Sequence, residues 1–589
     1  MADYLVDLCL KYFFRGVLVM LVLAVFIEGL MRLDVWLQGE VLVQHVWQVF
    51  LQIFANSGDL DGGRSFMGQL LAATGESLKL GLVAFFLVLA FALPLGLMAG
   101  RVAIAPSGWA GLGRWLGRAL LLPVMLVKGI PAFALACAVV FSLVYFQHLP
   151  VLVLIAKGGV GFADQDAWLA GAWRLLFPAS VMALTGIACL AGDVARTLRI
   201  GRAASFVAAA EDGAIHGDRL FFIYVVKNSL WEIGSAILRI VPYLMGALIL
   251  VEWVFGYPGL GSLIRAVAVD KDFVGLLAVG AMSALLVLLA CFAVEWVMGA
   301  VDKKTRSEGG LSLLTTREMA TGSELGRKVV AKRWRGLQQV GGVLLLLVGL
   351  LWALDLLVDF SADGEAWRWL DADVRDLLSA ASGACFLSVM ASVFSVAISF
   401  VLAGLLSWLG GWRVYGMLAK VHGAVWTVPV LFWLLAVSVV VGTSFWALLA
   451  VLTVVAALLG TGVLSRWFLV LEFQGWVEAA RISGLTRGQI FMRHLVPALW
   501  LRLWSRMLLL LPSMFLMVVA VDFALFEKGA PSVSLRWGGL LGSGYEGVWQ
   551  DPRLLFFAIM AVWAMAVFFA LLARWADVDQ EDPLGLDIF

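Results

Sequence analysis

Residues 475–497 read GWVEAARISGLTRGQIFMRHLVP and form a polar, basic insertion between two long apolar stretches. Glu478, Ala479 and Ala480 favour a helix, and Gly484 ends it, so that a second short helical run follows before Pro497. The small alanines let the backbone of another protein come close, and Glu478 supplies an anionic contact. The stretch therefore predicts a helix–turn–helix docking knob with a membrane span on either side.

The composition is that of an integral membrane protein. Of 589 residues, 62% are hydrophobic and 14% are charged, which is far more apolar than a soluble domain. The net charge of +1 offers no basic field for binding nucleic acid. The five cysteines lie apart, without C-x-x-C spacing, so we predict neither a disulfide framework nor a metal site.

Twelve stretches are long and apolar enough to cross a bilayer, which takes about 20 residues. In the first half they lie near residues 13–31, 79–98, 119–146, 175–195, 233–254 and 273–297. In the second half they lie near residues 340–358, 385–409, 422–441, 445–467, 504–523 and 552–572. Lys11 and Arg15 are expected to precede a first span that is retained and directs insertion. Residues 42–54 are short and amphipathic, which favours an interfacial helix.

The charges of the loops orient these spans. Residues 301–335 carry nine basic and four acidic side chains, and a basic excess of this kind marks a cytosolic segment. We therefore predict a first half at 1–300, a basic cytosolic linker at 301–337 and a second half at 338–589. Alternation from the linker places both termini and both polar insertions in the cytosol, and the acidic loop 359–376 outside.

The second half repeats the first at a constant spacing. The run 208–210 precedes Ala214 as the run 478–480 precedes Gly484, an offset of 478 − 208 = 270. The same offset relates Glu252 to Asp522, near the outer end of each fifth span. Such a repeat predicts two six-helix halves related by a pseudo-twofold axis.

The second insertion resembles the E-A-A, three residues, Gly, nine residues, I-x-L-P pattern of the coupling loop in ATP-binding-cassette (ABC) importer permeases. His494 stands where that pattern has Ile, and Val496 stands where it has Leu. In the first loop alanine replaces both the glutamate and the glycine, and Gly213 comes one position early, so we expect a looser contact or two unequal sites. The predicted coupling residues are Ala208, Ala209, Ala210, Glu211, Gly213 and Ala214 in the first loop, and Glu478, Ala479, Ala480, Arg481 and Gly484 in the second.

A second resemblance lies beyond each fifth span. The run VEWVFGYPGLG at 251–261 is similar to the E-x-V-F-x-x-P-G-L-G signature of one subunit of the dipeptide, oligopeptide and nickel permeases. Residues 531–541, with Pro531, Ser532, Trp537, Gly538 and Leu541, resemble the P-x-P-S-W-G-x-x-L segment of the other subunit, although 359–380 lacks the expected G-R-D element. The resemblance implies a type I ABC importer permease fold, all-α with about twelve transmembrane helices, in which two subunits are fused into one chain.

The outer ends of the spans supply candidates for a gate or a substrate path. They are Arg239, Glu252, Pro258, Gly259, Gly261, Asp522 and Trp537. Glu252 and Asp522 either cap the outer turn or contact substrate, because charges at membrane depth face the bundle interior or an aqueous path. Residues 258–261 either gate the mouth or form a plain re-entrant turn. Arg239 either lines the path or pairs with an acid.

No catalytic function is predicted for the chain. It has no G-x-x-x-x-G-K-[ST] motif, and its five histidines are dispersed. The resemblance implies that ATP and Mg belong to two partner ATPase subunits, identical or different, and that a periplasmic or extracellular substrate-binding protein delivers peptides, nickel or metal chelates. Membrane lipid is the remaining expected partner, and the bacterial inner membrane the expected location. The alternatives are a secondary, ion-coupled transporter with two six-helix repeats, which needs a deep coupling carboxylate, and an ABC exporter.

Overall fold

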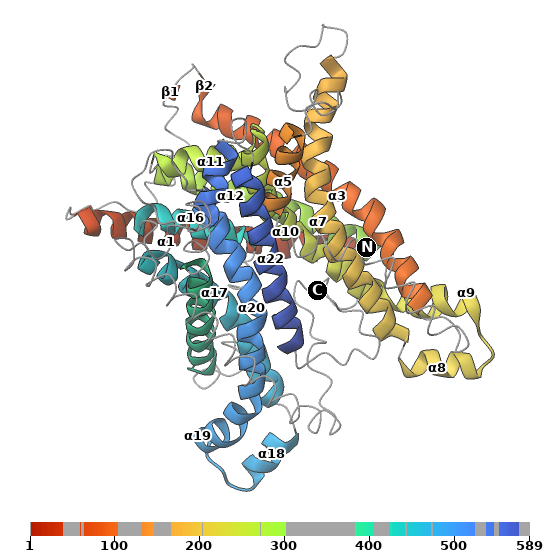
Figure 1. Cartoon of the computed structure of the whole chain (residues 1–589). Coiled ribbons are helices and arrows are strands. Elements are labelled where there is room, and N and C mark those ends of the chain that lie inside the picture. The colour runs from red at the N-terminus through yellow and green to blue at the C-terminus, as the bar shows by residue number, and fades with distance from the viewer. Residues whose placement is uncertain are drawn as a thin grey trace, which may run out of the picture. The chain divides into compact units, whose positions relative to one another are not determined.

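The protein is built almost entirely from helices, as a computed structural model of the chain shows (Figure 1). The structure describes residues 2–38, 59–60, 64–103, 132–145, 167–301 apart from 203 and 271, 383–405, 425, 427–441, 445–472, 475–524, 537–546 and 553–576. Strands β1 (Asp59–Leu60) and β2 (Arg64–Ser65) form one short antiparallel pair.

The chain divides into two compact units. The first consists mainly of Met1–Thr315, and the second of Thr316–Trp426 and Val430–Glu581. Only Val301 of the predicted linker is described, so the limits proposed for the two halves and the linker stay predictions.

The first unit contains the helices that lead into and out of the first polar insertion. Its helices are α1 (Ala2–Gln38), α3 (Phe66–Ala103), α5 (Ala132–Tyr145), α7 (Ala167–Arg202), α8 (Ser205–Asp212), α9 (Gly217–Arg219), the π-helix η3 (Leu220–Val226), the 3₁₀ turn η4 (Lys227–Ser229), α10 (Leu230–Phe255), α11 (Leu260–Val269) and α12 (Phe273–Val301).

The second unit repeats much of this order. Its helices are a segment at Gly383–Leu405, then α16 (Val430–Val441), α17 (Phe445–Glu472), α18 (Gly475–Ile482), α19 (Arg487–Ile490), the π-helix η7 (Phe491–Leu495), α20 (Val496–Ala524), α21 (Trp537–Glu546) and α22 (Arg553–Ala576). A proline interrupts α10 at Pro242 and α20 at Pro512, again 512 − 242 = 270 residues apart.

Eight helices in the described part of the chain are long and apolar enough to cross a membrane. They are Leu5–Phe26, Phe66–Arg101, Arg174–Arg202, Gly217–Phe255, Phe273–Val301, Gly383–Leu405, Phe445–Gly462 and Arg506–Phe523, and each coincides with one of the twelve predicted spans. The third, ninth and twelfth predicted spans contain the shorter helices α5, α16 and α22. The chain is therefore an all-α integral membrane protein.

Four predictions lie wholly outside the described residues. They are the interfacial helix at 42–54, the span at 340–358, the outer segment at 359–380 and the residues Pro531 and Ser532.

The first span begins earlier than predicted, and its basic residues lie within it. Helix α1 starts at Ala2, and the Nζ of Lys11 lies 2.9 and 2.8 Å from the two carboxylate oxygens of Glu295 in α12. The Glu295 side chain is completely buried. Because this ion pair neutralises Lys11, the lysine does not have to remain outside the apolar segment.

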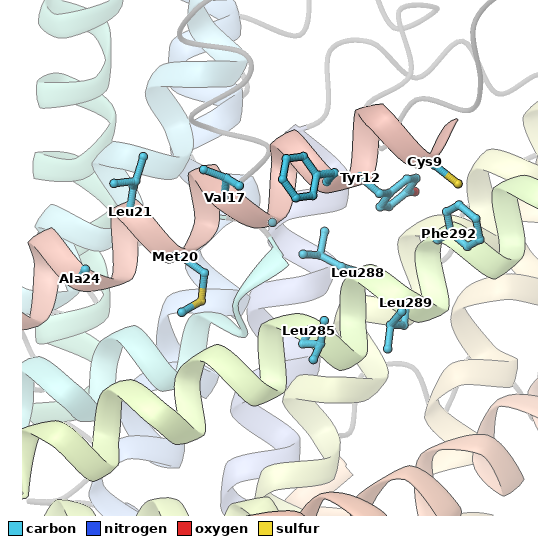
Figure 2. Close-up of a pocket in the computed structure, with 12 residues that line it drawn as sticks. Cys9, Tyr12, Val17, Met20, Leu21, Ala24, Leu285, Leu288, Leu289 and Phe292 are labelled. Atoms are coloured by element: carbon cyan, nitrogen blue, oxygen red, sulfur yellow. The ribbon is translucent and has the colours of Figure 1, made fainter. Parts of the chain in front are cut away.

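An open groove of about 700 Å³ runs beside this ion pair between α1 and α12 (Figure 2). Apolar side chains of both helices line it, including Val17 and Met20 from α1 and Leu285 and Leu289 from α12. Its surface matches the acyl chains of a bilayer rather than a polar solute.

Close helix packing forms the core of the first unit, where α3 lies along α7 (Figure 1). A Cβ added at Gly96 would lie 2.7 Å from the Cβ of Val194, and one at Gly100 would lie 2.7 Å from a methyl carbon of Leu198. Helices in membranes associate through small residues of this kind. The pair forms a rigid support for the loop that follows α7.

Candidate functional site

The two predicted coupling loops share one backbone structure. In each, an eight-residue helix is followed by a tight turn, a short helix and a π-helix. Helices α8 and α18 coincide at the predicted offset, since 475 − 205 and 482 − 212 both equal 270. Each loop lies at one end of its own unit (Figure 1).

The first loop turns at Ala214, which adopts a left-handed conformation with φ of +61°. Its N–H donates to the carbonyl of Glu211 at 2.9 Å, and the N–H of Ile215 donates to the carbonyl of Ala210 at 3.1 Å. These two bonds form a Schellman motif, which satisfies the last carbonyls of a helix. Gly213, with φ of −77°, does not supply the left-handed residue.

The second loop closes by the same bonds. Gly484 has φ of +82°. Its N–H donates to the carbonyl of Arg481 at 3.0 Å, and the N–H of Leu485 donates to the carbonyl of Ala480 at 3.2 Å. The first loop therefore keeps the turn without its glycine, although alanine pays a conformational cost that glycine does not.

Each loop has a buried face and an open face. Val207 and Ala210 of α8 are buried against their own unit, and so are the equivalent residues of α18, Val477 and Ala480. The two central positions between them are exposed in both helices: Ala208 and Ala209, and Glu478 and Ala479. A partner can reach these four residues. The third alanine of each run packs inward.

Two ion pairs hold the first loop to the long helices of its unit. A guanidinium nitrogen of Arg202, at the end of α7, donates to the half-buried carboxylate of Glu211. A guanidinium nitrogen of Arg101, at the end of α3, donates to Asp218 of α9. The sequence singled out Glu211 but not Asp218, because a partner 117 residues away leaves no local signal.

At the other end of the first unit, Glu252 caps a helix. Its side chain is completely buried. One carboxylate oxygen accepts a hydrogen bond from the Ser77 hydroxyl at 2.6 Å, and the other accepts one from the N–H of Gly261 at 2.6 Å. The Ser77 oxygen in turn accepts the N–H of Leu260 at 2.7 Å. The first two amides of α11 are thus satisfied by α10 and α3 together, as helix N-termini require.

This cap explains the glycines of the outer signature. A Cβ at Gly259 would lie 2.1 Å from a carboxylate oxygen of Glu252, and one at Gly261 would lie 2.5 Å from the carbonyl oxygen of Ile249. Gly256 ends α10 with φ of +59°. Pro258 is exposed between these glycines. The placement agrees with the capping alternative for Glu252, and a substrate contact by this segment stays a prediction.

The second unit contains a similar junction. Gly538, the second residue of α21, approaches α20 so closely that a Cβ would lie 2.4 Å from both the Cβ of Asp522 and the carbonyl oxygen of Val519. Val519 stands 270 residues after Ile249. Trp537 is buried, and its ring meets that of Phe515 edge-on at 5.5 Å. Asp522 is also buried, so it occupies the place that the offset from Glu252 predicts.

Arg239 lies half-exposed in the middle of α10. One of its guanidinium nitrogens lies 3.3 Å from a carboxylate oxygen of Asp193 in α7. Of the two alternatives, the structure shows the pairing with an acid. Within the described ranges, no group of three or more His, Cys, Asp or Glu side chains is arranged to hold a metal ion.

The geometry of the first unit corresponds to a known family. Residues 92–307, which include the first coupling loop and the capped junction, match the family described as binding-protein-dependent transport system inner membrane component. This segment is a permease domain of that family. The chain is thus a multi-pass permease component, with homologues that are themselves transport permeases.

Three relatives illustrate the similarity of this permease to known proteins. The oligopeptide transport system permease protein OppB of Haemophilus influenzae is 26% identical over 242 residues, which cover 40% of this chain and 71% of the relative. A putative peptide transport system permease protein of Brucella abortus (strain 2308) is 25% identical over 235 residues, or 39% of this chain and 68% of the relative. The inner membrane ABC transporter permease protein YejE of Escherichia coli K12 is 28% identical over 213 residues, or 35% and 60%.

Proposed function

We propose that this permease imports peptides or related small solutes, with metal chelates as a further possible cargo class, and that its two loops couple it to two ABC ATPase subunits. The observation that carries the proposal is the repetition of one helix–turn–helix, with the same turn and the same exposed face, 270 residues apart. A chain with two matched handles is suited to a partner with two equivalent sites. The relatives named as peptide permeases support the choice of cargo.

In this mechanism ATP and Mg are bound by the partners. Closure of the two ATPases draws α8 and α18 together, the attached spans tilt, and the cavity opens outward to a substrate-binding protein. Hydrolysis and release return the cavity to the inside. The first loop transmits the force through the ion pairs that Arg202 and Arg101 form, because these bind it to the ends of α7 and α3.

The proposal places both loops and both termini in the cytosol of a bacterium, with the capped junctions at the outer side of the inner membrane. Lipid acyl chains fill the groove between α1 and α12. A secondary transporter, the alternative, requires a carboxylate that exchanges protons or ions during transport. Glu252 does not suit that role, because Ser77 and Gly261 already donate to both of its oxygens.

Co-purification of the full chain with ATPase subunits from its own host tests the proposal. Glu478→Lys reverses a charge on the exposed face of α18, and Ala479→Trp blocks close approach there. Each is expected to lower ATPase recovery at least about 10-fold, as hot-spot changes of 1.4 kcal/mol or more do. Trp446→Leu, at a highly exposed position in α17, serves as the control. Unchanged recovery in both loop variants, or transport by the reconstituted chain alone, would contradict the proposal.

A further inference from the structure

The two coupling loops have the same shape but present different chemistry. Between residues 205 and 220, Glu211, Asp212, Asp218 and Arg219 give a charge of −3 + 1 = −2. Between the equivalent residues 475 and 490, Glu478, Arg481 and Arg487 give −1 + 2 = +1. A difference of three charges on two matched surfaces affects which partners each surface accepts.

Some exposed positions are alike in both loops. Phe206 of α8 corresponds to Trp476 of α18, and Phe222 of η3 corresponds to Met492 of η7; all four are exposed large hydrophobic residues. Exposed apolar side chains at matched positions indicate a common mode of docking. These residues therefore anchor each loop without distinguishing one partner from the other.

The differences lie at the C-terminal end of the eight-residue helices, beside the turn. Asp212 is exposed in the first loop. Ile482 takes its place in the second, and 83% of the isoleucine is exposed. One turn earlier, Ala208 corresponds to Glu478, and both are exposed.

The backbone excludes a simple structural reason for this exchange. Both helices end in the same Schellman bonds, and both bury the same two inward positions. Asp212 and Ile482 are on the open side of their helices, so neither is required by its own unit. Their difference must then be read by what docks against them.

We infer that the two loops bind two ATPase surfaces of different sequence: the first has a basic group opposite Asp212, and the second has an apolar pocket for Ile482 and a basic group opposite Glu478. This inference rests on the proposed function and adds the identity of each docking site. An acid in an apolar pocket remains without a partner, and an isoleucine against a basic group leaves that group unsatisfied. The pair thus excludes exchange of the two ATPase surfaces.

Photo-cross-linking in the assembled complex tests the inference. A photoreactive phenylalanine analogue replaces Ser205 in one chain and Gly475 in another, at the equivalent first positions of α8 and α18, outside the residues that differ in docking. The cross-linked ATPase peptides are then sequenced by mass spectrometry. The expected result is two peptides of different sequence, one from each probe.

Single exchanges identify the residues responsible. Asp212→Ile should lower the yield at the Ser205 probe at least about 10-fold, and Ile482→Asp should do the same at the Gly475 probe. Asp212→Glu and Ile482→Val should restore the yield, because they keep the charge and the apolar surface. Asp212→Ile retains the Arg202–Glu211 ion pair and the turn, so the loop keeps its fold.

The outcomes separate the two claims. Capture of one ATPase sequence by both probes, or unchanged yields after the exchanges, would overturn the inference and leave coupling itself intact. Capture of no ATPase peptide by either probe would overturn the proposed function, and the inference with it.

Discussion

The turns of the coupling loops offer two substitutions with opposite expected effects. Gly484 has φ of +82°, and a Cβ added there would meet nothing within 4 Å, so only backbone conformation opposes Gly484→Ala. A left-handed conformation costs an L-residue about 1–2 kcal/mol. Replacing glycine by alanine regains about 0.4–1 kcal/mol by restricting the unfolded chain. The net expectation is a loss of about 0.5–1 kcal/mol of local stability, and Ala214→Gly should gain a similar amount.

Amide hydrogen exchange in lipid nanodiscs measures this difference where it arises. A change of about 0.5–1 kcal/mol alters a local opening equilibrium about 2- to 5-fold. The N–H of Leu485, which is bonded to Ala480, should exchange faster by this factor in Gly484→Ala. The N–H of Ile215, which is bonded to Ala210, should exchange more slowly in Ala214→Gly.

Gly213→Ala provides the control, because Gly213 has φ of −77° and alanine adopts this conformation without penalty. A Cβ there would lie 3.4 Å from the carbonyl oxygen of Ala210, so the control introduces at most a slight contact. If Gly484→Ala and Ala214→Gly moved exchange in the same direction, or if Gly213→Ala accelerated it most, the assignment of the turn residue would be wrong.

Two further predictions concern the packing of the first unit. Gly261→Ala should lower the melting temperature, because its Cβ would lie 2.5 Å from the carbonyl oxygen of Ile249 and overpacking costs about 1–3 kcal/mol; Gly246→Ala, with nothing within 4 Å, should not, and equal melting temperatures would contradict the argument. Lys11→Met should cost about 3–5 kcal/mol of unfolding free energy in detergent, because it removes the ammonium that neutralises buried Glu295. Adding Glu295→Met should recover most of that loss, and an equally unstable double variant would show that the ion pair is not the cause.

The spans could be predicted from the sequence, because a bilayer requires a long apolar helix whatever surrounds it. Their ends could not. Lys11 looked like a flanking charge, but it lies inside the first helix because Glu295 neutralises it from a position 284 residues away. Likewise, α3 begins at Phe66 rather than near Lys79, and this early start brings Ser77 to the buried Glu252.

The candidate site was predictable to the extent that it repeats. The offset of 270 placed Ala214 opposite Gly484, and both residues make the turn. Which alanines face outward could not be read from the motif, since burial depends on the helices against which each loop packs; Ala210 and Ala480 are buried. The sequence also left two roles open for Glu252, and only the positions of Ser77 and Gly261 distinguish them.

The π-helices η3 and η7 occupy equivalent places, directly before the long helices that carry the fifth and eleventh spans. A π-turn holds a surplus residue relative to an α-turn. When that surplus passes one position along, everything beyond it turns by about 100° and advances by about 1.5 Å. Such a joint moves in discrete clicks. A push on either handle can thereby be converted into a spin of the long helix about its own axis, which exchanges the side chains that face the pore.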